Sequence, residues 1–206
     1  MVKRRDHKPV VGLMGQPGAG KSTVAAVMAE LGGGVVDADA LSRAVLSEPA
    51  VVDELVSWWG PSVQRDDGTL DRAAVGQRVF SEPTELARLE SLVHPRVAAG
   101  RAALHQQYEE DPAIRFIVED CPLLIESGLD ASCDRLVLVE SPRDVRLARV
   151  ASRGWDAAEL DRREAQQAPL DTRRERADDV ITNAGDRPQL LEPIRRAVRS
   201  LLSHPF

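Results

Sequence analysis

The segment from Gly15 to Ser22 reads GQPGAGKS and fits the pattern G-x-x-x-x-G-K-[ST]. The apolar run that precedes it, residues 10–14, is typical of a buried strand. The residues that follow, 22–31, have the pattern of a helix. A strand, a glycine-rich turn and a helix in this order form a P-loop, whose backbone N–H groups point at phosphate oxygens. The motif therefore predicts an α/β fold that binds a nucleoside triphosphate.

Each residue type in this loop has a physical role in holding ATP. Glycines let the backbone curl around phosphate groups, and Lys21 adds a mobile positive charge for the β- and γ-phosphates. The Ser22 hydroxyl can ligate Mg²⁺. Of the three lysines in the chain, Lys21 alone lies beyond the N-terminal tail, where the loop needs it. The expected ATP-binding residues of the loop are Gly15, Gln16, Pro17, Gly18, Ala19, Gly20, Lys21, Ser22 and Thr23.

Short apolar runs recur along the chain and alternate with helical stretches. This alternation predicts a parallel sheet covered by helices on both faces, a three-layer α/β/α arrangement. A closing amphipathic helix is expected over residues 188–202. The five predicted strands centre on residues 10–14, 35–36, 116–118, 136–139 and 180–181.

Two helical stretches interrupt the predicted core, which we place at about 9–39, 112–140 and 178–206 of a single 1–206 domain. The longer one, about 40–111, contains a turn at 66–68 and two tryptophans. Trp58 and Trp59 are expected in its core rather than as a stacking platform. The second stretch, about 142–176, is rich in arginine.

Two carboxylates follow the second predicted strand. Asp37 and Asp39 are two positions apart, so in an extended segment they would face the same way. Ligands bind at the carboxyl ends of the strands in such sheets, so a carboxylate here can accept a proton from a hydroxyl or help hold Mg²⁺. The spacing does not assign which of the two carboxylates serves the metal and which serves the acceptor, and we take Asp39 as the candidate at each site. The alternative for Asp39 is a helix N-cap.

Arg146, Arg149 and Arg153 have the spacing of one helix face. Such a helix can form a lid that closes over the γ-phosphate and excludes water. The alternative is a solvated surface, because the chain is rich in arginine. His94 is a lone histidine, which is more often structural than functional.

Composition narrows the setting. The net charge is -6, which disfavours bulk nucleic acid as a partner. Cys121 and Cys133 match no zinc or disulfide pattern and are expected as buried thiols in a reducing compartment. No apolar run is long enough to span a membrane, and residues 1–9 lack a signal-peptide core. We expect a cytoplasmic protein, monomeric or weakly self-associating.

Several motifs together resemble those of the dephospho-CoA kinase family. The resemblance covers nearly the whole chain, from about residue 11 to 185. Only the P-loop among these motifs is shared widely with other families. The motifs are GLMGQPGAGKSTVA, VVDADALSR, DDGTLDR, LVHPRV, DCPLLIESGL and ADDVITNAG.

The resemblance implies a five-stranded P-loop kinase core with a helical substrate-binding insertion and a lid. It also implies that ATP phosphorylates the ribose 3′-hydroxyl of dephospho-CoA, with Asp39 as the base. Arg149 and Arg153 would act from the lid, and Arg173 and Asn183 would lie near the adenine. The implied substrate-side residues are Arg43, His94, Pro122, Leu123, Leu124 and Glu126.

One departure from the family concerns the loop itself. Members more often read GGIGSGKS after a threonine, whereas this chain has Met14, Gln16 and Pro17 at the differing positions. The GxPGxGK form resembles adenylate kinase, but the DGFPR-type segment of adenylate kinase is not matched by DGTLDR.

Three other functions are weighed against this one, and the residues disfavour the second and the third. A nucleoside or nucleoside-monophosphate kinase could use the same scaffold. A GTPase-like switch would need N-K-x-D, and residues 183–186 read NAGD. A non-catalytic nucleotide-binding adaptor would not need the intact Lys21, Ser22 and Asp39.

Overall fold

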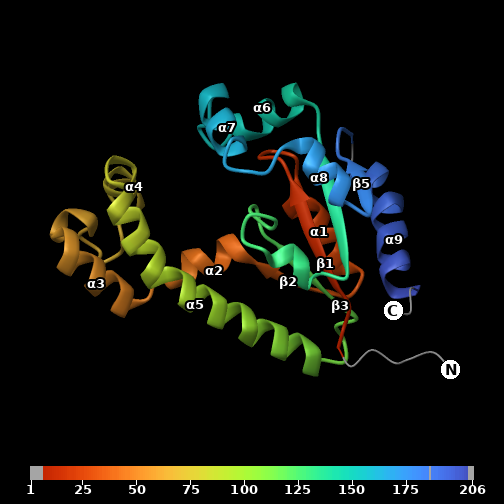
Figure 1. The fold of residues 1–206 in the computed structure, drawn as a ribbon, viewed down its shortest axis with the longest axis horizontal. Helices are drawn as coiled ribbons and strands as arrows, with labels where there is room; N and C mark the ends of the chain where they lie inside the picture. The colour runs from red at the N-terminus through yellow and green to blue at the C-terminus, as the bar shows by residue number, and fades with distance from the viewer. Residues whose placement is uncertain (1–6, 186, 204–206) are drawn as a thin grey trace. The chain divides into compact units, whose positions relative to one another are not determined.

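The computed structural model describes residues 7–185 and 187–203, which form two compact units (Figure 1). The first unit comprises the chain up to Asp37 and from His105 onward, and the second is Ala38–Leu104. Most of the polar N-terminal segment and Asp186 of the NAGD segment lie outside the described residues.

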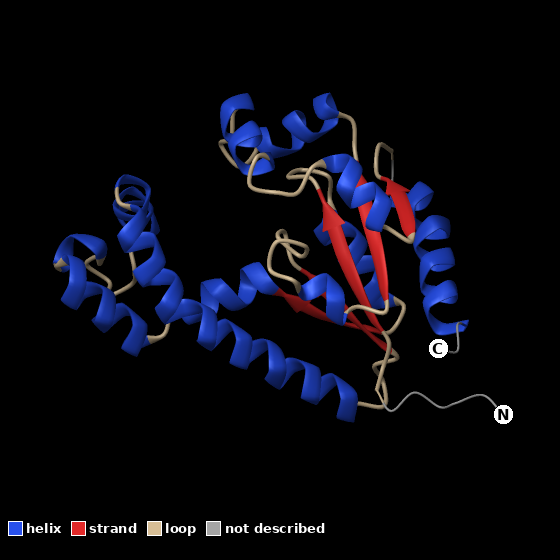
Figure 2. Ribbon diagram, viewed as in Figure 1, coloured by secondary structure: helices blue, strands red, loops and turns tan. Residues whose placement is uncertain are grey.

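The first unit contains the predicted parallel sheet, shown in red in Figure 2. The strand order is β2-β3-β1-β4-β5, and each neighbouring pair is parallel. The predicted five-stranded, three-layer fold is therefore confirmed. The strands are β1 (Val10–Gly15), β2 (Gly33–Asp37), β3 (Phe116–Asp120), β4 (Arg135–Glu140) and β5 (Asp179–Thr182).

Helices cover both faces of this sheet. On one face, Val11 and Leu13 belong to an apolar core that α1 (Lys21–Glu30) and α9 (Arg187–Ser203) complete. Gly12 faces the other way, where an added Cβ would lie 2.6 Å from Leu124. On that second face lie α8 (Leu170–Arg176), η2 (Leu129–Ser132) and the part of α5 from His105 onward.

The second strand begins earlier than its apolar residues indicate. Gly33 and Gly34 belong to β2, so the strand includes the two residues before the predicted 35–36. Gly32, at φ 94°, makes the turn alone. Gly34 lies under the Tyr108 ring, where a side chain on a strand residue would not fit.

The arginine-rich stretch folds as three helices. They are α6 (Arg143–Ala151), α7 (Ala157–Glu164) and α8. The predicted common face includes Arg146 and Arg149 but was wrong for Arg153, because α6 ends at Ala151. The chain then turns at Gly154, at φ 75°.

The second unit is entirely helical among its described elements. Its helices are α2 (Ala38–Val45), α3 (Pro49–Trp59), η1 (Pro61–Val63), α4 (Arg72–Ser81) and α5 (Pro83–Glu110), the last of which continues past Leu104 into the first unit. Trp59 is buried in its core, as predicted, and Trp58 packs against that core. Asp71 caps α4 by accepting bonds from the Ala73 and Ala74 amides.

The core of this unit should determine its stability. Leu55 is fully buried, so Leu55→Ala leaves a cavity and should lower the free energy of unfolding by about 2–5 kcal/mol. Leu86 is 41% exposed, and Leu86→Ala should change the free energy of unfolding by less than about 0.5 kcal/mol. Urea unfolding of both variants measures the difference. Equal losses would contradict this account of the core.

Candidate active site

The P-loop joins the end of β1 to the start of α1, at the carboxyl edge of the sheet. Gly18 and Gly20 both have positive φ, at 78° and 89°. A Cβ on Gly20 would lie 2.2 Å from the Asn183 amide nitrogen. Glycine is therefore required at Gly20 for both backbone conformation and space.

Every carbonyl of this loop from Gly15 to Gly20 accepts a hydrogen bond. Three of these bonds are local, one from the Ala19 amide to the Gln16 carbonyl and two from the Thr23 and Val24 amides to the Gly20 carbonyl. The others come from side chains of distant segments. These are Gln167 Nε2 to Gly15 at 3.1 Å, Arg146 Nη1 to Pro17 at 3.4 Å, Arg149 Nη1 to Gly18 at 3.4 Å, and Asn183 Nδ2 and Ser141 Oγ to Ala19 at 2.9 and 3.1 Å.

These contacts fix which way the loop peptides face. In a planar trans peptide the N–H points opposite to the C=O. The carbonyls of four loop residues point at surrounding side chains, so the N–H groups of those same peptides point away from these side chains. The four residues are Gly15, Pro17, Gly18 and Ala19. An inward set of N–H groups is what a phosphate group binds.

Arg149 makes the largest number of these contacts. Its Nη1 also donates to the Ala19 carbonyl at 3.3 Å and to Ser141 Oγ at 2.9 Å. Its Nη2 donates to the backbone carbonyl and to Oδ1 of Asn183, each at 3.1 Å. The residue predicted to act on the transferring phosphoryl group thus contacts the carbonyl side of the loop. Asn183, predicted near the adenine, is buried beside it.

Lys21 pairs with a carboxylate at the same sheet edge. Its Nζ lies 2.5 Å from Asp120 Oδ1, and both side chains are largely buried. Strand pairing places Asp37 opposite Asp120. Ser22 and Thr23, in the first turn of α1, are exposed. Lysine, hydroxyl and carboxylate groups therefore gather where β1, β2 and β3 end.

The two predicted aspartates do not share an extended segment. β2 ends at Asp37 and α2 begins at Ala38, so Asp39 lies in the first turn of that helix. The expectation that the pair faces one way was therefore wrong. The N-cap alternative for Asp39 was also wrong, because Asp37 precedes the helix. An acidic side chain in the first turn interacts favourably with the positive end of the helix dipole.

Arg43 and His94 belong to the second unit with Asp39. Arg43 lies one turn after Asp39 on α2, and its carbonyl accepts bonds from Ser47 and Arg72. His94 lies within α5 and is exposed. All three side chains are accessible on the surface of this unit.

The segment after β3 contains the predicted Pro122, Leu123 and Glu126. The Pro122 carbonyl accepts a bond from Gln167 at 2.8 Å, and Glu126 accepts one from the Ala168 amide. Leu123 is 37% exposed, whereas the neighbouring Leu124 is buried and packs beneath β1.

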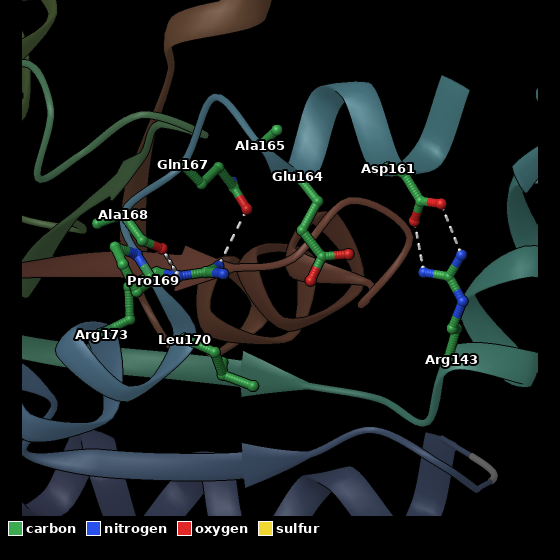
Figure 3. A pocket seen from close by; sticks show the side chains of 9 residues that line it. All are labelled: Arg143, Asp161, Glu164, Ala165, Gln167, Ala168, Pro169, Leu170 and Arg173. Carbon is green, nitrogen blue, oxygen red and sulfur yellow. Dashed lines mark hydrogen bonds and ion pairs between the residues drawn. The ribbon is translucent and has the colours of Figure 1, made fainter. Parts of the chain in front are cut away.

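A pocket of about 410 Å³ lies among α6, α7 and α8 (Figure 3). Arg173 lines it, with Nη1 donating to Gln167 at 3.0 Å and Nε to the Ala168 carbonyl at 2.9 Å. Burial lowers the pKa of Arg173, and the nearby Glu164 opposes that shift. An arginine remains charged under such a shift, so the pocket keeps a cation in its wall.

Gln167, Ser141 and Glu164 are site residues that the sequence analysis missed. Gln167 links the Gly15 and Pro122 carbonyls and accepts from Arg173. No spacing rule identifies such a residue, since its contacts join segments far apart in the chain. The only signal was a polar cluster, 166–167, between two predicted helices.

The residues around the loop suit Mg²⁺ held mainly by its nucleotide. The Ser22 hydroxyl is exposed at the loop end, and oxygen donors are the ligands this ion prefers. Among the described residues there is no group of three or more His, Cys, Asp or Glu side chains that could hold a metal ion. A site with few protein ligands is typical of Mg²⁺ bound with substrate phosphates.

Known proteins resemble this chain over most of its length. The family model for dephospho-CoA kinase matches residues 9–189. The chain belongs to the dephospho-CoA kinase family. A dephospho-CoA kinase of Deinococcus radiodurans is 40% identical over 95% of this chain and 93% of its own length. One from Anaeromyxobacter dehalogenans is 44% identical over 85% of this chain and 84% of its own.

A solved structure supports the fold independently. The crystal structure of TT1252 from Thermus thermophilus has a TM-score of 0.80 and is 34% identical, covering 97% of this chain and all of its own. Among the described residues, no helix is long and apolar enough to cross a membrane.

In this family member, Arg149→Lys tests the carbonyl contacts. A lysine offers one compact cation and cannot bond all of the Arg149 acceptors at once. The Kd for ADP should rise about tenfold, the equivalent of one charge-assisted hydrogen bond. Arg199→Lys, at an exposed ion pair with Glu192, is the matched control and should leave it unchanged. Calorimetry measures both, and a parental Kd in Arg149→Lys would contradict the role.

Proposed function

We propose that this chain transfers the γ-phosphoryl group of ATP to the ribose 3′-hydroxyl of dephospho-CoA, giving ADP and coenzyme A. Its family is one of kinases, and the P-loop with its outward-held carbonyls supports a triphosphate site. The single observation that carries the proposal is this loop within a chain that matches the dephospho-CoA kinase family over residues 9–189.

The donor side uses the first unit. Backbone N–H groups of the loop over residues 15–23, where Pro17 has none to offer, bind the β- and γ-phosphates. Lys21 exchanges Asp120 for a phosphate oxygen. Ser22 would hold Mg²⁺, with Asp39 contributing, and the bound ion would neutralise charge on the phosphates. Asp120 remains close enough to orient the Lys21 ammonium. Arg173 and Asn183 bind on the adenine side.

The acceptor side involves the second unit and the segment after β3. Asp39 orients the 3′-hydroxyl and takes its proton as the oxygen attacks phosphorus. Asp39 is an exposed carboxylate in the first turn of α2, where it is accessible to a hydroxyl. Dephospho-CoA is bound by Arg43, His94, Pro122, Leu123 and Glu126.

The lid supplies positive charge and excludes water. Arg149 acts through the loop that it holds from the carbonyl side, and Arg153 supplies positive charge for the transferring group. Arg153 is exposed and lies 5.8 Å from the Trp155 ring, so it is available to a ligand. Excluding water matters because it would compete with the 3′-hydroxyl for the phosphoryl group.

We further propose that the enzyme acts in the cytoplasm as a monomer or weak homo-oligomer, without nucleic acid or membrane partners. Cys121 and Cys133 form no disulfide in the described part of the chain, which is compatible with a reducing compartment. Cys121 is buried as expected, but Cys133 is only half-buried.

Replacing the proposed base gives a direct test of mechanism. Asp39→Asn keeps the size of the side chain but removes the proton acceptor, so kcat should fall about 10²- to 10⁴-fold. The Kd for ATP should change little. Asp37→Asn, two residues earlier, is the comparison and should lose less activity. Near-parental turnover of Asp39→Asn would remove Asp39 from this role.

The acceptor is tested with purified protein, Mg-ATP and either dephospho-CoA or AMP. We expect 3′-phosphorylation of dephospho-CoA and no ADP formation from AMP. Chelating Mg²⁺ with EDTA should abolish turnover, because the triphosphate charge is then not neutralised. Phosphorylation of AMP alone would replace this function with a nucleoside-monophosphate kinase.

A further inference from the structure

Gln16, one of the residues that departs from the usual family loop, has a buried side chain that bonds to the lid. Its Nε2 donates to Glu164 Oε1, and the residue is 7% exposed. Glu164 is the last residue of α7 and extends away from that helix (Figure 3). The first turn of the P-loop is thus joined directly to the lid.

Arg146 completes the connection from α6. Its Nη1 donates to Glu164 Oε2 at 3.0 Å and to the Pro17 carbonyl at 3.4 Å. The Arg146 side chain is 5% exposed, and its Nε is buried with no hydrogen-bond partner among the described residues. Glu164 is the ion-pair partner of this guanidinium and compensates its charge where water has little access. One carboxylate oxygen binds the loop and the other binds α6.

These contacts lie on the carbonyl side of the loop. Arg146 reaches the Pro17 carbonyl, and carbonyls in this loop point away from the side where phosphates bind. Glu164 also opposes the loss of charge on Arg173, which lines the neighbouring pocket. The carboxylate therefore links the loop, α6 and α7 electrostatically without facing the phosphates.

We propose that Glu164 is a positioning residue for ATP, which latches α6 and α7 onto Gln16 and Pro17 and so fixes the first turn of the P-loop. The inference rests on the proposal that this loop binds ATP. The proposal predicts that removal of the Glu164 carboxylate weakens ATP binding, whereas the loss of its negative charge alone would strengthen it. Removing a carboxylate near an anion site should tighten anion binding by Coulomb attraction, whereas removing a latch should weaken it.

The test compares Glu164→Gln, Gln16→Glu and the double variant Gln16→Glu/Glu164→Gln. Glu164→Gln should raise the Kd for Mg-ADP about tenfold, the equivalent of one hydrogen bond to a charged group. The KM for ATP should rise equally, with kcat and the KM for dephospho-CoA nearly unchanged. Gln16→Glu brings two carboxylates together and should also weaken binding. The double variant restores one donor and one carboxylate in exchanged positions and should recover most of the parental affinity.

Glu159→Gln is the matched control. Glu159 lies on the same helix and pairs with Arg163 at 2.6 Å, but it does not contact the loop, so its Kd for Mg-ADP should be parental. Two results would contradict the latch. One is a Kd for Mg-ADP in Glu164→Gln that is equal to or lower than the parental value. The other is a Kd in the double variant raised by the product of the two single-variant increases. Thermal unfolding identifies any variant that fails to fold. The Kd values of the variants that do fold then decide whether Glu164 positions the loop.

ADP binding needs no acceptor, so the two proposals fail separately. Absence of ADP binding by the parental protein would contradict the proposed function. A parent that binds ADP, with Glu164→Gln binding equally well, would end the latch alone.

Discussion

The outward anchoring of the P-loop carbonyls is the interaction on which the rest of the structure depends. Fixing a glycine-rich backbone costs about 1–2 kcal/mol per residue, and glycine has more freedom to lose than other residues. A hydrogen bond from a charged donor contributes about 1.5–3 kcal/mol, and a neutral one about 1 kcal/mol. The bonds to the loop carbonyls are of the size needed to offset that cost before any ligand arrives.

The residues that hold the loop come from distant parts of the chain. Asn183 follows β5, Ser141 follows β4, and Arg149 and Gln167 come from the helical stretch between those strands. A parallel sheet brings the ends of its strands to one edge, so these segments meet where β1 ends. The fold thus prepares the N–H groups for phosphate, while Lys21 is held by Asp120. The residues proposed for the acceptor side lie in a second, helical unit with its own core. They are Asp39, Arg43 and His94.

The sequence predicted the features that follow from local pattern. Apolar runs located the strands, and the glycine and lysine spacing located the loop. It was less successful where tertiary contacts decide. Asp39 was expected in an extended segment, but α2 begins at Ala38, and Arg153 was expected on α6, which ends two residues earlier. Gln167 and Glu164 could not be found from the sequence, because the loop residues that they contact are far from them along the chain.

The central claim is that the loop is already shaped for phosphate by its carbonyl contacts. A crystal structure of the chain with Mg²⁺ and a non-hydrolysable ATP analogue tests it most directly. We expect the bonds from Asn183, Arg149 and Gln167 to the loop carbonyls to persist, with Lys21 moved from Asp120 to a phosphate oxygen. A loop that releases these side chains and turns its carbonyls over on binding the analogue would contradict the claim.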